Sequence, residues 1–204
     1  MPAAAARERT LLLMWEYTAG DSPLWARSAD LDAGQLDAAE LGLSERLRSA
    51  LEDWNDRCEI AADPNDLLPT PTTPAAWRAL EVEAFALAAR VQRALGDDWT
   101  VWCLAGEGDG GLRDCGALGL EARTRGVPVL LRFEGPVAWT PDGVEPALER
   151  FPDALRRRVH VWRATADGTS PAAYRADALE LAGALHGVLP AGRLLWFGGD
   201  DPPA

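Results

Sequence analysis

The order of apolar segments along the chain predicts an α/β fold, with a mainly parallel or mixed central sheet of about five strands flanked by helices. Short apolar runs alternate with longer segments in which apolar residues recur every three or four positions. A helix between two strands carries the chain back to the same end of the sheet, which makes those strands parallel. Short runs do not fix strand direction, so the alternative is an α+β fold with an antiparallel sheet and helices on one face.

Five apolar runs are predicted to be strands, because each is short and bounded by turn-forming or charged residues. The first leads into a Gly-Asp-Ser-Pro turn, which a polar, acidic loop follows. The predicted strands span residues 10–17, 99–105, 127–133, 159–162 and 194–197.

The first helix is predicted to begin after Ser44, whose hydroxyl can accept a hydrogen bond from the free amides of the first turn. An apolar stripe then repeats at helical spacing, which predicts the buried face of this helix. The stripe consists of Leu47, Leu51, Trp54 and Cys58.

A long second helix is predicted to begin at Pro74, a residue suited to the first helical position. It is predicted to end before Gly96, because helices commonly end at a residue with a left-handed backbone conformation and glycine adopts that conformation readily. Its predicted buried stripe is Trp77, Leu80, Ala84, Leu87, Val91 and Leu95.

Further helices are expected at 112–125, 145–157 and 171–188. Four prolines mark a loop between two parts of the chain. The expected organisation is an N-terminal strand-loop-helix unit (1–62), a Pro-rich loop (63–74) and an alternating α/β region (75–204) that forms one compact domain with the N-terminal unit.

The charge balance excludes several classes of function. The chain has 32 acidic and 20 basic residues, a net charge of −12, and every basic residue is Arg. An acidic protein is a poor general binder of nucleic acid, because phosphates need a basic surface. The lack of Lys removes Schiff-base chemistry and the phosphate-binding lysine of P-loop enzymes. The absence of Lys and the near absence of Ile and Asn suggest a GC-rich genome, typical of actinobacteria.

Cysteine usage and targeting signals indicate a soluble cytoplasmic protein. The three cysteines are an odd number with no C-x-x-C pair, so neither a disulfide scaffold nor a structural zinc site is expected. The apolar run near the start is too short for a signal peptide, and no run is long enough to cross a bilayer. No metal site is predicted.

One glycine-rich segment matches the pattern of a dinucleotide-binding loop. Residues 106–111 read G-x-G-x-x-G after a predicted strand, with an acidic residue 23 positions later. Glycines let the backbone approach a pyrophosphate, and the carboxylate can bind a ribose hydroxyl. Two acidic residues inside the loop oppose phosphate binding, so an exposed acidic turn is the commoner interpretation. A site for NAD or another nucleotide would use Gly106, Gly108, Gly111 and Glu134.

The sequence offers few other candidate catalytic residues. The one nucleophile–base combination to consider is Cys115, near a predicted helix start, with His160, in a predicted strand. A structural, hydrogen-bonded role for His160 is the more common outcome. His186, near the end of the last predicted helix, is expected to be a capping or surface residue.

The nine tryptophans divide into two groups. Those expected in the core, because they lie on apolar faces, are Trp54, Trp77, Trp102, Trp162 and Trp196. Those at strand ends or in loops either cover the core or form a contact surface, since tryptophan is enriched at binding hot spots. This second group is Trp15, Trp25, Trp99 and Trp139.

The N-terminal hundred residues resemble a group of uncharacterised actinobacterial proteins. The matching segments are residues 13–17 (LMWEY), 24–25 (LW), 41–48 (LGLSERLR) and 51–57 (LEDWNDR). The resemblance implies no catalytic residue, but it directs attention to Trp15-Glu16-Tyr17 and to Trp54-Asn55-Asp56-Arg57. Arg57 could form a bidentate pair with Glu16 if the first helix packs on the first strand.

Negative charge, exposed aromatics and the lack of catalytic groups together favour a protein without catalytic activity that binds another, basic protein. An immunity or accessory protein is the expected type. The alternative is a nucleotide- or dinucleotide-binding α/β enzyme. The predicted partner-binding residues are Trp15, Glu16, Tyr17, Trp25, Trp99 and Trp139.

Overall fold

The computed structural model describes residues 9–16, 19, 22–26, 34–62, 73–103, 151–165 and 168–188. Three strands and four helices lie in this part of the chain. They are β1 (Arg9–Leu13), β2 (Leu24–Ala26), α1 (Glu45–Ala61), α2 (Pro74–Leu95), β3 (Trp99–Cys103), α4 (Asp153–Ala164) and α5 (Pro171–His186). None of these helices has the length and apolar character needed to span a membrane.

The strands form one mixed sheet in the order β2-β1-β3. β1 runs antiparallel to β2 and parallel to β3, with Leu13 opposite both Leu24 and Cys103. The α/β class is therefore consistent with the prediction, whereas five strands are not supported. The sequence reading missed β2, which was assigned to the acidic loop because it has only three residues. The predicted strands 127–133 and 194–197, and the helix 112–125, lie outside the described residues.

The predicted strand at residues 159–162 is wrong, because these residues belong to helix α4. Val159 and Trp162 are buried, while Val161 is 64% exposed. A strand would place Val159 and Val161 on the same face, so this burial pattern is helical. The four residues 159–162 are too short a segment to reveal the helical period. Of the helix predicted at 145–157, residues 145–150 lie outside the described residues, and α4 begins at Asp153 and continues through 159–162 to Ala164.

The predicted starts of the first two long helices, and the predicted end of the second, are confirmed. Ser44 accepts a hydrogen bond from the Leu47 amide at the start of α1, and Pro74 opens α2. Gly96 ends α2 with a φ of 75°, a conformation that favours glycine. The predicted stripe of α1 is buried; in α2 the stripe is buried except for Trp77 and Leu95, which are half-buried. The last predicted helix, 171–188, corresponds to α5.

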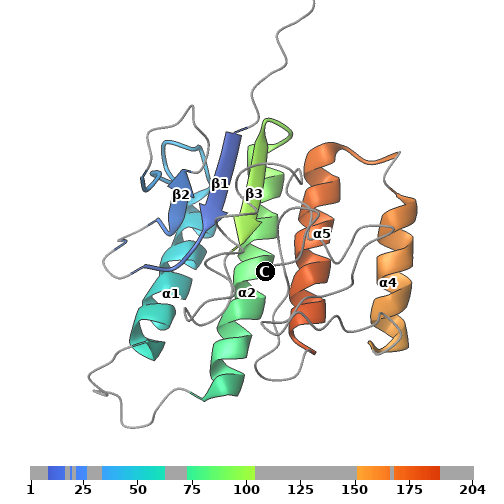
Figure 1. Cartoon of the computed structure of the whole chain (residues 1–204). Helices are drawn as coiled ribbons and strands as arrows, with labels where there is room; N and C mark the ends of the chain where they lie inside the picture. Colours follow the sequence, from blue (N-terminus) through green and yellow to red (C-terminus); the bar gives the residue numbers. More distant parts are fainter. Residues whose placement is uncertain are drawn as a thin grey trace, which may run out of the picture.

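The four helices lie side by side in the order α1-α2-α5-α4, with the three strands at the α1–α2 end of the row (Figure 1). Every one of these helices and strands contributes buried side chains to one hydrophobic cluster. Trp25 of β2 is partly buried and packs against that cluster. Of the tryptophans expected in the core, Trp54, Trp102 and Trp162 are buried. Trp196 lies outside the described residues.

Small residues let α2 and α5 approach each other closely. Each of these helices has a pair of fully buried alanines spaced four residues apart, and Gly183 of α5 faces Phe85 of α2. A Cβ atom added to Gly183 would lie 2.8 Å from the Phe85 Cβ, closer than side chains tolerate. The alanines are Ala84, Ala88, Ala178 and Ala182.

Buried polar groups join the start of β3 to the same two helices. The Gln92 carboxamide of α2 accepts a hydrogen bond from the Val101 amide at 2.9 Å and donates to the Trp99 carbonyl at 2.9 Å. Arg175 of α5 donates to that carbonyl at 2.6 Å. Asp97 accepts a hydrogen bond from the Ala172 amide, in the first turn of α5, at 2.6 Å. The turn before β3 is thereby tied to the beginning of α5.

We expect Gly183→Ala to lower the free energy of unfolding by about 1–2 kcal/mol. Crowding against Phe85 costs about 1–3 kcal/mol, more than the roughly 0.5–1 kcal/mol gained by replacing a helical glycine. Urea unfolding measures the change. Gly187→Ala is the matched control, because the nearest atom to its Cβ would be a Val82 methyl carbon at 3.3 Å, with the Gly183 and Ala184 carbonyl oxygens at 3.5 and 3.7 Å. A Gly183→Ala protein as stable as the control would contradict this view of the α2–α5 contact.

Candidate partner-binding surface

After β1 the chain continues through Met14, Trp15 and Glu16, and α1 holds the backbone of Glu16 in place. Asn55 of α1 is buried, and its carboxamide oxygen accepts a hydrogen bond from the Glu16 amide at 3.2 Å. Its amide nitrogen donates to the Glu16 carbonyl at 3.4 Å and to a Glu59 carboxylate oxygen at 3.0 Å. Asn55 thus satisfies both backbone groups of Glu16, as a neighbouring strand would, and leaves the Glu16 side chain exposed.

Three tryptophans surround this exit. Trp15 lies against Trp77 of α2, with ring centroids 6.1 Å apart and ring planes at 41°. Trp25 of β2 donates its indole N–H to the Met14 carbonyl at 3.1 Å. All three rings are half-buried. We call Trp15, Glu16, Trp25 and Trp77 the β1 exit surface.

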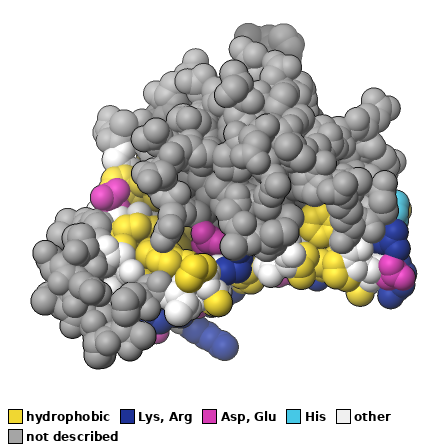
Figure 2. Space-filling view, turned by 60° about the horizontal axis from the view of Figure 1, so that its bottom comes forward, with side chains coloured by type: hydrophobic (Ala, Val, Ile, Leu, Met, Phe, Trp, Pro, Cys, Tyr) yellow, Lys and Arg dark blue, Asp and Glu magenta, His cyan; other side chains and the backbone are white. Residues whose placement is uncertain are grey.

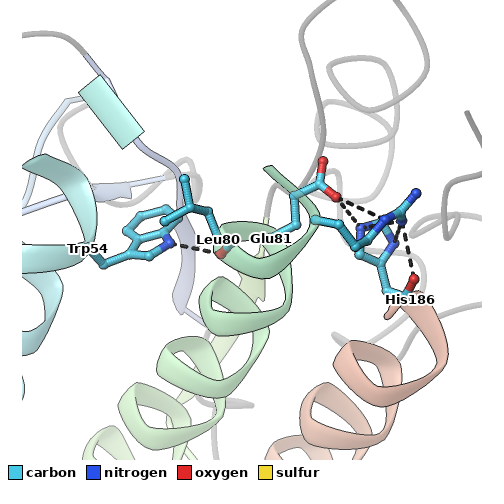
Figure 3. Close-up of polar contacts among 5 residues, drawn as sticks. Trp54, Leu80, Glu81 and His186 are labelled. Atoms are coloured by element: carbon cyan, nitrogen blue, oxygen red, sulfur yellow. Dashed lines mark hydrogen bonds and ion pairs between the residues drawn. The ribbon is translucent and has the colours of Figure 1, made fainter. Parts of the chain in front are cut away.

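Leu80 and Glu81 are adjacent in α2 and connect this helix to its two neighbours, α1 and α5 (Figure 3). The indole N–H of Trp54, from α1, donates to the Leu80 carbonyl at 2.9 Å. On the other side, His186 at the end of α5 places its Nε2 2.6 Å from the Glu81 carboxylate. Arg78 lies 3.1 Å from the His186 Nδ1 and also donates to the His186 carbonyl at 3.2 Å.

The expectation that His186 caps a helix or faces solvent is wrong, since its side chain is 1% exposed. The Glu81 carboxylate can only accept a hydrogen bond, which places a proton on the Nε2 of His186. One guanidinium nitrogen of Arg78 lies near both ring nitrogens, 2.8 Å from Nε2 and 3.1 Å from Nδ1. Burial lowers the pKa of His186, and the Arg78 charge lowers it further, against the opposing effect of Glu81. A neutral histidine thus fills a polar gap between two packed helices.

The two cysteines in the described residues belong to the core. Burial raises the pKa of Cys58 to about 12 and raises that of Cys103 well above its usual value. Both thiols are therefore protonated near neutral pH and are poor nucleophiles. In the same part of the chain, no three His, Cys, Asp or Glu side chains gather in a group that could hold a metal ion.

The structure separates the tryptophans that were predicted to bind a partner. Trp15 and Trp25 meet at the β1 exit surface, whereas Trp99 lies at the opposite end of the parallel strands, opposite Arg9 in register. Trp99 is buried, and the Arg9 guanidinium lies 5.5 Å above its ring centroid. The six residue steps from Arg9 to Trp15, through β1 and the two residues after it, correspond to roughly 20 Å of extended chain, so Trp99 does not share a surface with Trp15.

The settings predicted for Arg57 and His160 differ from those in the structure. Arg57 pairs with Glu83 of α2 at 2.6 and 2.8 Å, not with Glu16, because it lies on the α2 side of α1. His160 is exposed on α4 rather than placed in a strand. The remaining candidates lie outside the described residues: Gly106, Gly108, Gly111, Cys115, Glu134, Tyr17 and Trp139.

Sequence reasoning missed the polar residues that organise this region. Nothing in the pattern of α1 shows that Asn55 binds the backbone beyond β1, although asparagine is nearly absent from the chain and its presence in a helix is unusual. Trp77 was assigned to the core rather than to a surface. The Arg78–Glu81–His186 cluster joins residues more than a hundred positions apart, so no local signal could reveal it.

One comparison with known proteins gives a match. Residues 9–105 match the profile of a family described as Serratia CdiI immunity protein-like. This stretch begins with β1 and extends just past β3, so it includes all three described strands, α1, α2 and the complete β1 exit surface. None of the curated proteins compared with the chain matches it.

We expect stability to fall with acidification because of His186. Its pKa is lower in the folded protein than the 6.5 of a free imidazole, so the unfolded chain binds the proton more tightly. The free energy of unfolding should therefore decrease as the pH falls through about 6.5. His186→Gln keeps a donor and an acceptor without titrating, and should have a shallower slope between about pH 7.5 and 5.5 in denaturant titrations. The exposed His160→Gln control should retain the wild-type slope; equal slopes in all three proteins would refute the assignment.

Replacing Asn55 should loosen the chain beyond β1. Asn55→Ala removes the hydrogen-bond partner of the Glu16 amide, at a cost of about 1–3 kcal/mol in the free energy of unfolding. The Glu16 carbonyl keeps its hydrogen bond from the Ala19 amide, at 3.2 Å. The neighbouring Asp56→Ala, at an exposed position, should change it by less than about 0.5 kcal/mol. Urea unfolding measures both. Similar effects of the two substitutions would mean that Asn55 does not hold the exit.

Proposed function

We propose that this chain is an immunity-type protein that binds a toxin and blocks it by covering its surface, without catalysing a reaction. The observation that carries the proposal is the match of residues 9–105 to the CdiI immunity protein-like family. Proteins of that kind bind a partner toxin protein. Such a role requires an interface rather than an active site, in keeping with the two protonated core thiols and the neutral, buried His186.

The β1 exit surface is the proposed contact region. Its tryptophans offer large contact areas at low conformational cost, and aromatic residues dominate the binding energy of many interfaces. Hydrogen bonds from Asn55 and from the Trp25 indole hold the backbone of this segment before a partner arrives. Pre-organisation of this kind reduces the entropy lost on binding.

The proposed partner is basic, and the proposed site of action is the cytoplasm. A net charge of −12 attracts a positively charged protein and speeds its association, an effect that salt screens. Glu16, exposed beside Trp15, brings a carboxylate to the contact region itself. An odd number of cysteines agrees with a reducing compartment.

The test begins with the genes next to this one. A cell that makes a toxin without its immunity protein poisons itself, so the two genes must be inherited together. We expect that one neighbouring product is toxic when expressed alone, is neutralised by this chain, and binds it with a dissociation constant measurable by calorimetry. If no neighbouring product is toxic or bound, the proposed function is wrong.

Two substitutions then test the contact region. Trp15→Ala should weaken binding about 30-fold, the size of a hot-spot loss of about 2 kcal/mol. Glu16→Arg should slow association of a basic partner and reduce its dependence on salt. Asp98→Arg, the same kind of charge change in the exposed turn before β3, is the control and should have little effect. If both variants neutralise the toxin as well as the wild type does, the proposed function stands, but the β1 exit surface is not the contact region.

A further inference from the structure

The two outermost helices of the row carry opposite charges. α4 has arginines at 156, 157, 158 and 163 against one acidic residue, Asp153, which pairs with Arg156. Arg157 and Arg158 are exposed and form no ion pair with any described residue. α1 contains three arginines, one of which is paired with Glu83 of α2. Its acidic residues are Glu45, Glu52, Asp53, Asp56 and Glu59.

Each of these helices also exposes a large apolar side chain within its charged residues. Ile60 of α1 is 53% exposed and follows Asp53 and Asp56 at helical spacings of seven and four. Arg57, three residues before Ile60, has its charge paired with Glu83 of α2. Val161 of α4 is 64% exposed and follows Arg157 and Arg158 at spacings of four and three. Residues at these spacings lie on one face of a helix. α1 therefore presents an apolar residue with acidic neighbours, and α4 presents one with basic neighbours.

These surfaces lie at opposite ends of the helix row. α2 lies beside α1 on one side, and α5 lies beside α4. In Figure 2, dark blue arginine side chains gather at the right-hand end, the end at which α4 lies in Figure 1. Within the described part of the chain, neither outermost helix has a second helical neighbour.

We propose that α4 of one copy of this chain docks on α1 of a second copy, head to tail, so that the helix row continues from one molecule into the next. Opposite charges then meet around two apolar side chains. Contacts of α1 with α1, or of α4 with α4, would instead bring like charges together. Since the two surfaces differ and lie at opposite ends, the contact does not close within a dimer and can add further copies.

The association is expected to be weak and dependent on salt. Exposed ion pairs contribute little individually, and two helix faces bury less than the roughly 1,000 Å² of a stable interface. Two copies with net charges of −12 repel each other at long range, but salt near 0.1 M screens this repulsion beyond about 10 Å. Association should therefore be detectable at high protein concentration in moderate salt and decline in strong salt.

Sedimentation equilibrium with charge-reversed variants tests the proposal. Arg157→Glu with Arg158→Glu gives one variant, and Asp53→Arg with Asp56→Arg gives the other. Each alone should associate at least tenfold more weakly than the wild type, because its α1 and α4 then carry like charges. An equimolar mixture should regain association, since α4 of each variant is again complementary to α1 of the other. Arg90→Glu with Asp98→Arg, at exposed positions on neither surface, should behave as the wild type.

Several results would overturn the proposal: a wild-type protein that stays monomeric at every concentration, reversed variants that associate like the wild type, or a mixture that does not regain association. Circular dichroism establishes that each variant is folded. If a reversed variant does not fold, Arg157→Gln with Arg158→Gln and Asp53→Asn with Asp56→Asn replace it. Each neutralised variant alone should then also associate more weakly. Their mixture should form a one-to-one pair and nothing larger, and failure of that pair to form would refute the contact.

Discussion

The backbone of β3 needs hydrogen-bond partners on the edge that does not face β1, and one buried side chain of α2 provides them. The carboxamide of Gln92 has the donor and acceptor of a peptide group, so it takes the place of one peptide of a neighbouring strand at Trp99 and Val101. Arg175 of α5 donates hydrogen bonds to the Gln92 carboxamide oxygen and to the Trp99 carbonyl, so α5 joins the same network. Leaving these buried groups unpaired would cost about 1–3 kcal/mol each, so the junction of α2, β3 and α5 depends on this interaction.

The position of α2 determines much of what surrounds it. Parallel pairing with β3 sets the register of β1, and the residues after β1 reach Trp77 near the start of α2. α1 meets α2 through the Trp54–Leu80 hydrogen bond, and α5 meets it through His186 and Glu81. The β1 exit surface is therefore assembled from the residues after β1, from β2 and from α2, so that half-buried tryptophans far apart in sequence lie in one region.

The helices were more predictable than the strands or the polar contacts. Ser44, Pro74 and Gly96 are local signals, and each marks a real helix end because capping depends on a few adjacent residues. The segment 159–162 was misread since four residues do not distinguish a strand from a turn of helix. His186 and Gln92 were beyond sequence reasoning for another reason: polar residues of an amphipathic helix are assigned to solvent unless their distant partners are known.

By itself, the sequence determined the charge, the composition, the starts of α1 and α2, the end of α2 and the apolar stripes of both helices, because these depend on residue type and short-range spacing. It also indicated a binding role through aromatic and acidic residues. Only the tertiary structure decided which tryptophans share a surface, that Arg57 pairs with Glu83, and that Asn55 holds the chain beyond β1. Those contacts join residues brought together by packing, and local periodicity carries no information about which distant side chain will lie opposite.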